Sequence, residues 1–291
     1  MKRIAIFPFS YLCFAFLLFS INIPAVPAQQ IDAPVLHEAV RFYEKGVYYH
    51  SRGSYNEAVT AYRQAIGEKP DFAEAFNNLG KVYAELDRYA DAVDSFDQAI
   101  RLKPEYAEAY NNIGVVYTDL NRFQEAVNVF RQAINLRPDY AVAHNNLGKA
   151  YIYLSRYKEA AEAFLKAATI NPKDGGMQRN LGFAYLKLGR YEEAVKAFKT
   201  AIGFKPDYFA AYNDLGVAYS KLGLYREAAE YLEQAISINS NCDEARLNLG
   251  LIQLSLKNYG AAQEQYTKLK SLNSGLADIL HKSILKTRRE K

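Results

Sequence analysis

A row of polar side chains that recurs every 34 residues is the feature of this sequence best suited to binding another molecule. Its members are Asn78, Asn112, Asn146, Asn180, Asp214 and Asn248. A carboxamide carries donors and an acceptor, so it can pair with the amides of a peptide backbone whatever side chains that peptide bears. The row therefore predicts a site for an extended peptide. The competing interpretation is an ordinary polar helix face whose residues were copied by duplication.

The residues that flank this row divide by charge along the chain. Later positions hold Lys149, Phe183, Lys187 and Lys221, together with Val142, Tyr153, Val217 and Leu251. Earlier positions hold mainly carboxylates: Glu44, Glu74, Glu85, Glu108 and Asp119, against Lys81. We predict a binding surface that is acidic at one end and apolar and basic at the other, which would orient a ligand more than tighten its binding. The alternative is a set of solvated helix faces with incidental charge.

No residues have the spacing of a catalytic or metal site. The two cysteines, Cys13 and Cys242, and four scattered histidines offer no metal-ligand pattern. A repeated carboxylate, at Glu57, Asp91, Glu125, Glu159, Glu193 and Glu227, is better explained by the helix dipole than by catalysis. There is no glycine-rich phosphate loop or nucleophile elbow. We expect no enzymatic activity, no cofactor and no metal.

Composition and charge narrow the class of partner. The 291 residues are 50% hydrophobic and 23% charged, enough to bury a core. The net charge is 36 − 32 = +4. Lys2 and Arg3 supply +2, and residues 282–291 supply 5 − 1 = +4, so the body of the chain is near −2. A weakly acidic body argues against a nucleic-acid groove, which needs a basic stripe to neutralise phosphates.

Three residue types share one 34-residue period, which indicates an internal repeat. Glycine recurs from Gly46 to Gly250, alanine from Ala58 to Ala262, and proline from Pro70 to Pro206. Seven units fill residues 39–276. Within each unit, apolar residues at steps of three and four predict two helices joined by a short turn. The small glycine and alanine are expected to let the two helix backbones approach closely, and proline to end the second helix.

This pattern resembles the tetratricopeptide repeat family, through segments such as residues 78–83 (NLGKVY) and 191–198 (YEEAVKAF). The resemblance implies an all-α, right-handed superhelical solenoid of antiparallel helix pairs, whose first helices line a concave groove. It departs from the family because tryptophan never opens a first helix, and because the last unit lacks the aromatic at Gln253 and the proline at Ser274. The asparagine row is similar to the peptide-binding ladder of O-linked N-acetylglucosamine transferases.

The last 15 residues, 277–291, are predicted to form a capping helix and a basic tail. Ile279, Leu280, Ile284 and Leu285 would form its apolar face, which an open solenoid needs to cover its end.

The N-terminus has the three-part form of a secretory signal: Met-Lys-Arg, an apolar run from Ile4 to Ile23, and a Pro-Ala segment. We predict a signal peptide over residues 1–28, cleaved after Ala28, with residues 29–38 as a lead-in segment. The protein would then be of bacterial exported type, periplasmic or secreted. The alternative is an uncleaved membrane anchor, because the run is about as long as the ~20 residues of a spanning helix. After cleavage, Cys242 is expected to be buried or to pair with a second copy.

These observations predict a non-enzymatic interaction scaffold or assembly factor that holds an extended peptide in its concave groove. Two alternatives remain. One is a membrane-tethered subunit of an envelope complex, in which residues 1–23 or the basic tail contact lipid. The other is a substrate-recruiting subunit for a separate glycosyltransferase, which rests on the asparagine row alone.

Overall fold

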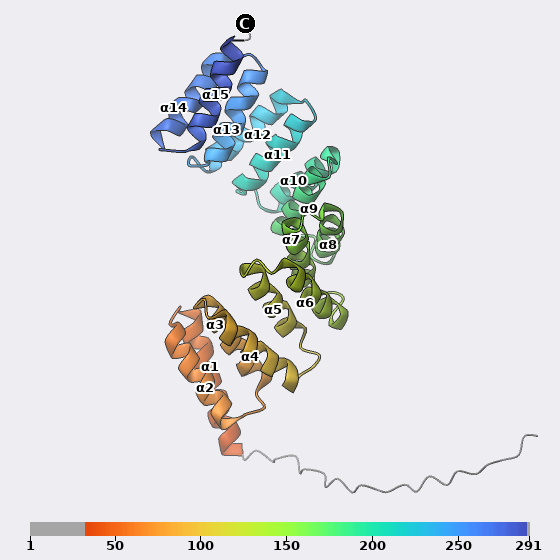
Figure 1. The fold of residues 1–291 in the computed structure, drawn as a ribbon, viewed down its shortest axis with the longest axis vertical. Helices are drawn as coiled ribbons and strands as arrows, with labels where there is room; N and C mark the ends of the chain where they lie inside the picture. The colour runs from red at the N-terminus through yellow and green to blue at the C-terminus, as the bar shows by residue number, and fades with distance from the viewer. Residues whose placement is uncertain (1–32, 290–291) are drawn as a thin grey trace, which may run out of the picture.

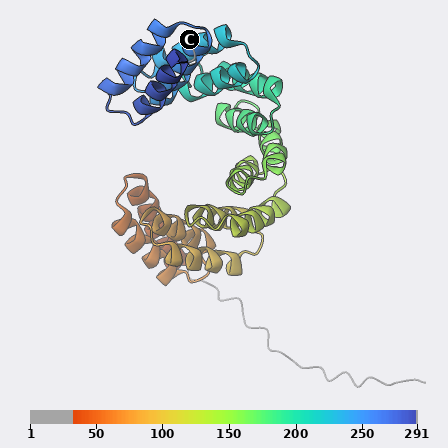
Figure 2. The same cartoon turned by 45° about the horizontal axis from the view of Figure 1, so that its top comes forward.

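The computed structural model describes residues 33–289, which form a continuous array of helices and no strand (Figure 1). The helices are α1 (Ala33–Ser51), α2 (Tyr55–Glu68), α3 (Ala73–Glu85), α4 (Tyr89–Leu102), α5 (Ala107–Asp119), α6 (Phe123–Leu136), α7 (Ala141–Tyr153), α8 (Tyr157–Ile170), α9 (Gly175–Lys187), α10 (Tyr191–Phe204), α11 (Phe209–Lys221), α12 (Tyr225–Ile238), α13 (Asp243–Ser255), α14 (Tyr259–Ser271) and α15 (Leu276–Arg289). They form the predicted right-handed solenoid of helix pairs, which curves into an arc in Figure 2.

Each unit consists of an odd-numbered first helix and an even-numbered second helix, and its core follows from helical periodicity. In α6, Ala126, Val127, Phe130 and Ala133 are buried, at steps of one, three and three residues, and they form one apolar stripe. Phe130 shares a cluster with Leu147 of α7. Each second helix thus packs against the first helix of its own unit and that of the next.

The recurring glycine is required by a close contact inside each unit. A side chain from the second helix lies directly on the glycine of the first: a Cβ at Gly114 would stand 2.4 Å from the Phe130 ring, and one at Gly148 would stand 2.6 Å from Phe164. The sequence-based expectation was an approach of two backbones. In the structure, the space that glycine leaves is filled by an aromatic or leucine side chain of the second helix.

Turns and prolines end the helices where the sequence predicted. The second residue after each first helix adopts positive φ, as at Gly189 (75°) and Asp87 (57°), and glycine tolerates this conformation without steric cost. A proline lies two residues beyond the end of the second helices α2, α4, α6, α8 and α10. For example, α2 ends at Glu68, Lys69 is extended, and Pro70 follows. The residue before a proline disfavours helical geometry, so the helix stops there.

The C-terminal end is covered by α15, which begins at Leu276, one residue before the predicted start. Its buried face consists of Ala277, Leu280 and Ile284. Ile279 and Leu285, which the sequence placed on that face, are 49% and 40% exposed, because α15 turns a narrower stripe toward the array. A Cβ at Gly250 would lie 2.5 Å from Leu280, so α15 fills the place that the second helix fills in other units.

The N-terminal end begins inside the predicted lead-in segment, because α1 starts at Ala33 rather than at residue 39. The predicted signal peptide, residues 1–28, lies outside the described residues. Between residues 33 and 289, no helix combines the length and the apolar character needed to cross a bilayer.

Candidate functional site

The asparagine row lies on successive first helices, and each of its carboxamides is already engaged with the preceding unit. The Nδ2 of Asn112 donates to the Oδ1 of Asn77 over 2.9 Å. The same bond joins Asn146 to Asn111 (3.1 Å), Asn180 to Asn145 (2.8 Å) and Asn248 to Asn213 (2.9 Å). Each bond is a rung between neighbouring units. The row is therefore part of what holds the array in register, a role that the sequence analysis did not assign to it.

The acceptors of these rungs were missed from the sequence although they carry a signal of their own. Asn77, Asn111 and Asn145 directly precede the row and are only 4–9% exposed. The recurring Asn-Asn dipeptide is that signal, because a buried carboxamide needs a hydrogen-bond partner. The row itself, from Asn78 onward, is half-buried apart from Asp214.

Two rungs differ chemically from the others. Asn78 donates to the hydroxyl of Tyr43 over 2.8 Å. Farther along, the Nε of Arg179 donates to Asp214 over 2.6 Å, so a charged pair replaces two carboxamides. Burial raises the pKa of the Asp214 carboxyl, and the Arg179 guanidinium offsets part of that shift. Asp214 is 9% exposed, so it anchors Arg179 and is not free for a ligand, contrary to the sequence prediction.

The rungs leave hydrogen-bonding capacity in the row. Asn146 and Asn180 each use one amide hydrogen in a rung, which leaves a second hydrogen and the Oδ1 acceptor. Asn112 also accepts a longer bond of 3.4 Å from Asn111. A peptide backbone can therefore still pair with these side chains while the rungs remain formed.

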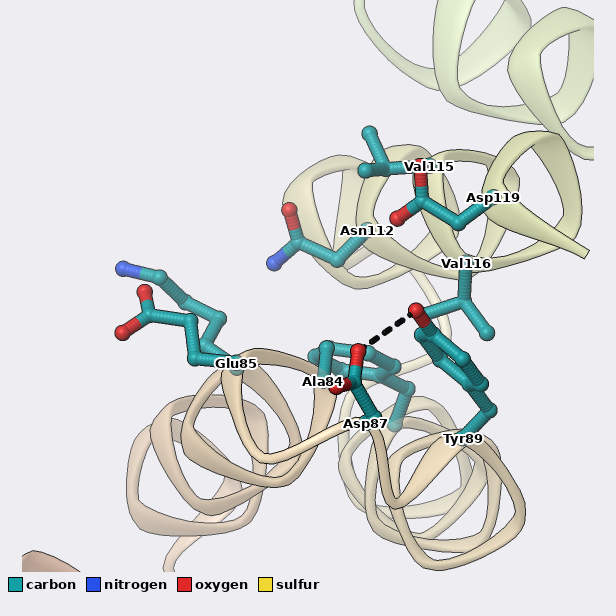
Figure 3. Close-up of a pocket in the computed structure, with 10 residues that line it drawn as sticks. Ala84, Glu85, Asp87, Tyr89, Asn112, Val115, Val116 and Asp119 are labelled. Atoms are coloured by element: carbon teal, nitrogen blue, oxygen red, sulfur yellow. Dashed lines mark hydrogen bonds between the residues drawn. The ribbon is translucent and has the colours of Figure 1, made fainter.

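A pocket of about 530 Å³ opens between α3 and α5, beside Asn112 (Figure 3). Glu85, Asp87 and Asp119 line it, and Val115 contributes an apolar wall. Asp87 accepts a hydrogen bond of 2.8 Å from the Tyr89 hydroxyl. Burial, reinforced by Asp87, raises the pKa of Asp119. This α3/α5 pocket is the predicted acidic end of the surface, and Asp87 and Tyr89 are members that the sequence analysis did not name.

A second pocket, of about 220 Å³, opens between α7 and α9. It is lined by Lys149, Ile152, Tyr153, Phe164, Arg179, Asn180 and Phe183. Tyr153 is 62% exposed and stacks on Phe123 with ring centroids 4.5 Å apart. The Lys187 ammonium lies 5.2 Å from the centre of the Phe183 ring at the edge of this pocket. The α7/α9 pocket is the predicted apolar and basic end.

The remaining predicted residues lie apart from these pockets. Lys221 is exposed on α11, one unit beyond the α7/α9 pocket. Two acidic residues of the early units are paired with cations: Glu74 with Lys103 at 3.4 Å and Glu108 with Arg137 at 2.8 Å. The acidic character of the early units is therefore concentrated in the α3/α5 pocket.

Groups that could support chemistry do not converge within residues 33–289. No three side chains of His, Cys, Asp or Glu in this range are placed to hold a metal ion. Cys242 is 5% exposed, and burial raises the pKa of its thiol. Of the two expectations for this cysteine, burial is confirmed.

Sequence comparison identifies one kind of repeat along most of the chain. Family models described as TPR repeat or tetratricopeptide repeat match residues 46–87 and 184–223, 71–139, 111–175, 209–242 and 243–275. Together these matches cover residues 46–175 and 184–275. No curated protein matches the chain at a significant level.

Solved structures share the fold at low sequence identity. YrrB, a TPR protein with an unusual peptide-binding site, is 24% identical, with a TM-score of 0.56, over 65% of this chain and 97% of its own. PilW, a type IV pilus biogenesis factor, is 23% identical, with a TM-score of 0.65, over 72% and 97%. A tetratricopeptide repeat protein from Parabacteroides merdae is 20% identical, with a TM-score of 0.61, over 86% and 98%.

Proposed function

Because the chain belongs to the tetratricopeptide repeat family, we propose that it is a non-enzymatic scaffold whose concave groove binds an extended segment of a partner protein. The observation that carries this proposal is the pair of pockets beside Asn112 and Asn180. Each pocket opens between first helices of adjacent units, next to a rung asparagine with unused hydrogen-bonding capacity. A peptide can pair its backbone with the row and place side chains in the pockets.

The charges of the two pockets give the bound peptide a direction. The α3/α5 pocket presents three carboxylates and one cation, Lys81, whereas the α7/α9 pocket presents Lys149 and Arg179 beside three aromatic rings. A partner segment with a basic residue toward one end and an apolar or acidic residue toward the other fits one orientation. Complementary charge of this kind favours the correct encounter and disfavours the reverse.

The structural relatives support a protein or peptide as the ligand class. YrrB has a peptide-binding site, and PilW acts in the biogenesis of a pilus, a protein assembly. For the present chain we propose the same class of partner in an exported location, periplasmic or secreted. Removal of residues 1–28 would release the array.

The test uses two matched triple variants that break the same three rungs. A chain beginning at Gln29 first selects ligands from a displayed library of random peptides, and calorimetry then measures one selected peptide. N112A/N146A/N180A removes the groove-facing carboxamides, and N77A/N111A/N145A removes only their buried partners. Each lost hydrogen bond is worth about 0.5–1.5 kcal/mol, so the first variant should bind one to three orders of magnitude more weakly.

The second variant should retain most of the affinity, because the groove-facing carboxamides remain. Circular dichroism checks that both variants keep their helicity. If the first variant binds as tightly as the unmodified chain, or if both lose affinity equally, the row acts only in holding the units together and the proposal is wrong.

A further inference from the structure

The N-terminal end of the array departs from a packing rule that the other units obey. Along α3 and the residue that caps it, four residues at steps of four, three and four face the preceding unit: Ala75, Leu79, Val82 and Leu86. Leu79 and Val82 lie in one core cluster with Val59 and Tyr62 of α2. The corresponding positions of α5, α7, α9, α11 and α13 hold only Ala, Met, Leu, Ile or Val.

In the first unit these four positions are Arg41, Lys45 and Tyr48 of α1 and Arg52 directly after it, which we call the end stripe. The same steps along the helix place them on one face. All four side chains are exposed, Tyr48 to 53%. The face that would otherwise bury an apolar stripe is thus a basic and aromatic surface at the N-terminal end of the array, the end at which α1 lies in Figure 1.

A polar end face keeps an open solenoid soluble, but solubility does not require that it be basic. Glu38 pairs with Arg41 and is the stripe's one acidic partner among residues 33–289. Lys45 and Arg52 have no carboxylate within ion-pair distance in the described part of the chain. They lie instead over aromatic rings, Lys45 at 5.5 Å from the centre of Phe42 and Arg52 at 5.1 Å from that of Tyr48. Cations held beside the exposed ring of Tyr48 and the half-buried ring of Phe42 match an anionic surface with an apolar layer beneath it.

The composition of the stripe favours a membrane as that surface. Basic side chains near a membrane surface are attracted to anionic lipid headgroups, and tyrosine is favoured at the membrane interface. We propose that the end stripe docks the array onto an anionic membrane surface, so that its groove projects away from the bilayer.

The test is sedimentation with lipid vesicles. A chain that begins at Gln29 is used, because the helices start at Ala33 and the apolar run would bind lipid by itself. Vesicles contain phosphatidylglycerol and phosphatidylcholine, or phosphatidylcholine alone. R41Q/K45Q/R52Q removes three charges from the stripe, and K149Q/K187Q/K221Q removes three exposed charges from the first-helix face. The stripe variant should bind the anionic vesicles at least about tenfold more weakly than the unmodified chain. The control variant should bind them like the unmodified chain.

Other outcomes contradict the proposal and identify the alternative. Equal loss in both triple variants shows an effect of net charge alone. Equal binding to both kinds of vesicle, or no binding to either, removes anionic lipid as the partner. A further chain that ends at His281 separates the stripe from the basic tail: if this truncation abolishes binding while the stripe variant binds normally, the tail is the lipid contact.

Discussion

The α3/α5 and α7/α9 pockets occupy equivalent places two units apart, yet they present opposite chemistry. Both are lined by a lysine of the earlier helix, Lys81 of α3 or Lys149 of α7. Both are also lined by a rung asparagine of the later helix, Asn112 of α5 or Asn180 of α9. Both are lined by a phenylalanine, Phe96 or Phe164, that lies on the unit's glycine. The shared phenylalanine and asparagine are those that packing and the rungs require, and the shared lysine is exposed.

The residues that differ are those that neither form a rung nor contact the unit's glycine. Glu85 of the first pocket corresponds to Tyr153 of the second, Val115 to Phe183, and Asp119 to Lys187 at the pocket's edge. A repeat scaffold therefore fixes where a pocket forms and leaves its charge and size free to vary. The following predictions test this separation, in order of decreasing effect.

The largest effect is expected from removal of the shared phenylalanine. Phe96→Ala and Phe164→Ala should each lower the free energy of unfolding by about 3–5 kcal/mol, because each ring is 1% exposed and no neighbour can fill its volume. Urea unfolding followed by circular dichroism measures both variants. Equal losses would show that the two pockets share one packing frame, and a loss below about 1 kcal/mol at either site would break the comparison.

A smaller effect is expected at the charged rung beside the α7/α9 pocket. Arg179→Asn leaves Asp214 buried without a cation and should cost about 1–3 kcal/mol in unfolding free energy. The double variant R179N/D214N rebuilds the neutral rung of the other units and should recover most of this loss. If the double variant is no more stable than the single one, the charged pair is not interchangeable with a carboxamide rung.

Electrostatic steering at the basic end should change association rates more than affinity. In K149E/K187E/K221E, the association rate of a selected acidic peptide at low salt should fall about tenfold, because exposed charges guide encounter. The difference should shrink at high salt. The control K158E/K166E/K196E reverses three exposed lysines on the second helices α8 and α10. Stopped-flow kinetics that show the same fall in both variants would refute a groove-specific field.

The smallest effect concerns pH at the acidic end. The pKa of Asp119 is raised above its ordinary value of 3.8, by burial and by Asp87. A carboxyl whose pKa is higher in the folded state lowers stability as pH rises from the unfolded value through the folded one. Asp119→Asn should therefore stabilise the protein by less than about 0.5 kcal/mol at pH 7, discounted for solvent screening, and by nothing at pH 3. Thermal unfolding at the two pH values measures the difference, and a stabilisation of the same size at pH 3 would assign it to another cause.

Much of the fold could be predicted from the sequence because the helices of residues 33–289 contact only helices of the same unit or of a neighbouring unit. The 34-residue period and the steps of apolar residues indicate the helix pairs, and the prolines mark the ends of α2, α4, α6, α8 and α10 to within two residues. The placement of Asn112, Val115 and Asp119 together also follows from helical spacing, and all three line the α3/α5 pocket. The role of these residues in binding stays a prediction.

The sequence by itself determined the repeat, the helix pairs and the residue types on each helix face, because these depend on spacing within one unit. Only the tertiary structure decided which side chains meet across units. The rungs join residues 35 apart, such as Asn77 and Asn112. Arg179 and Asp214, which form an ion pair, are separated by the same number of residues. This separation is one residue longer than the 34-residue repeat because it depends on how successive units pack. It cannot be predicted from the spacing of residues within one unit. The same packing places Leu280 of α15 on Gly250 and leaves the end stripe of α1 uncovered.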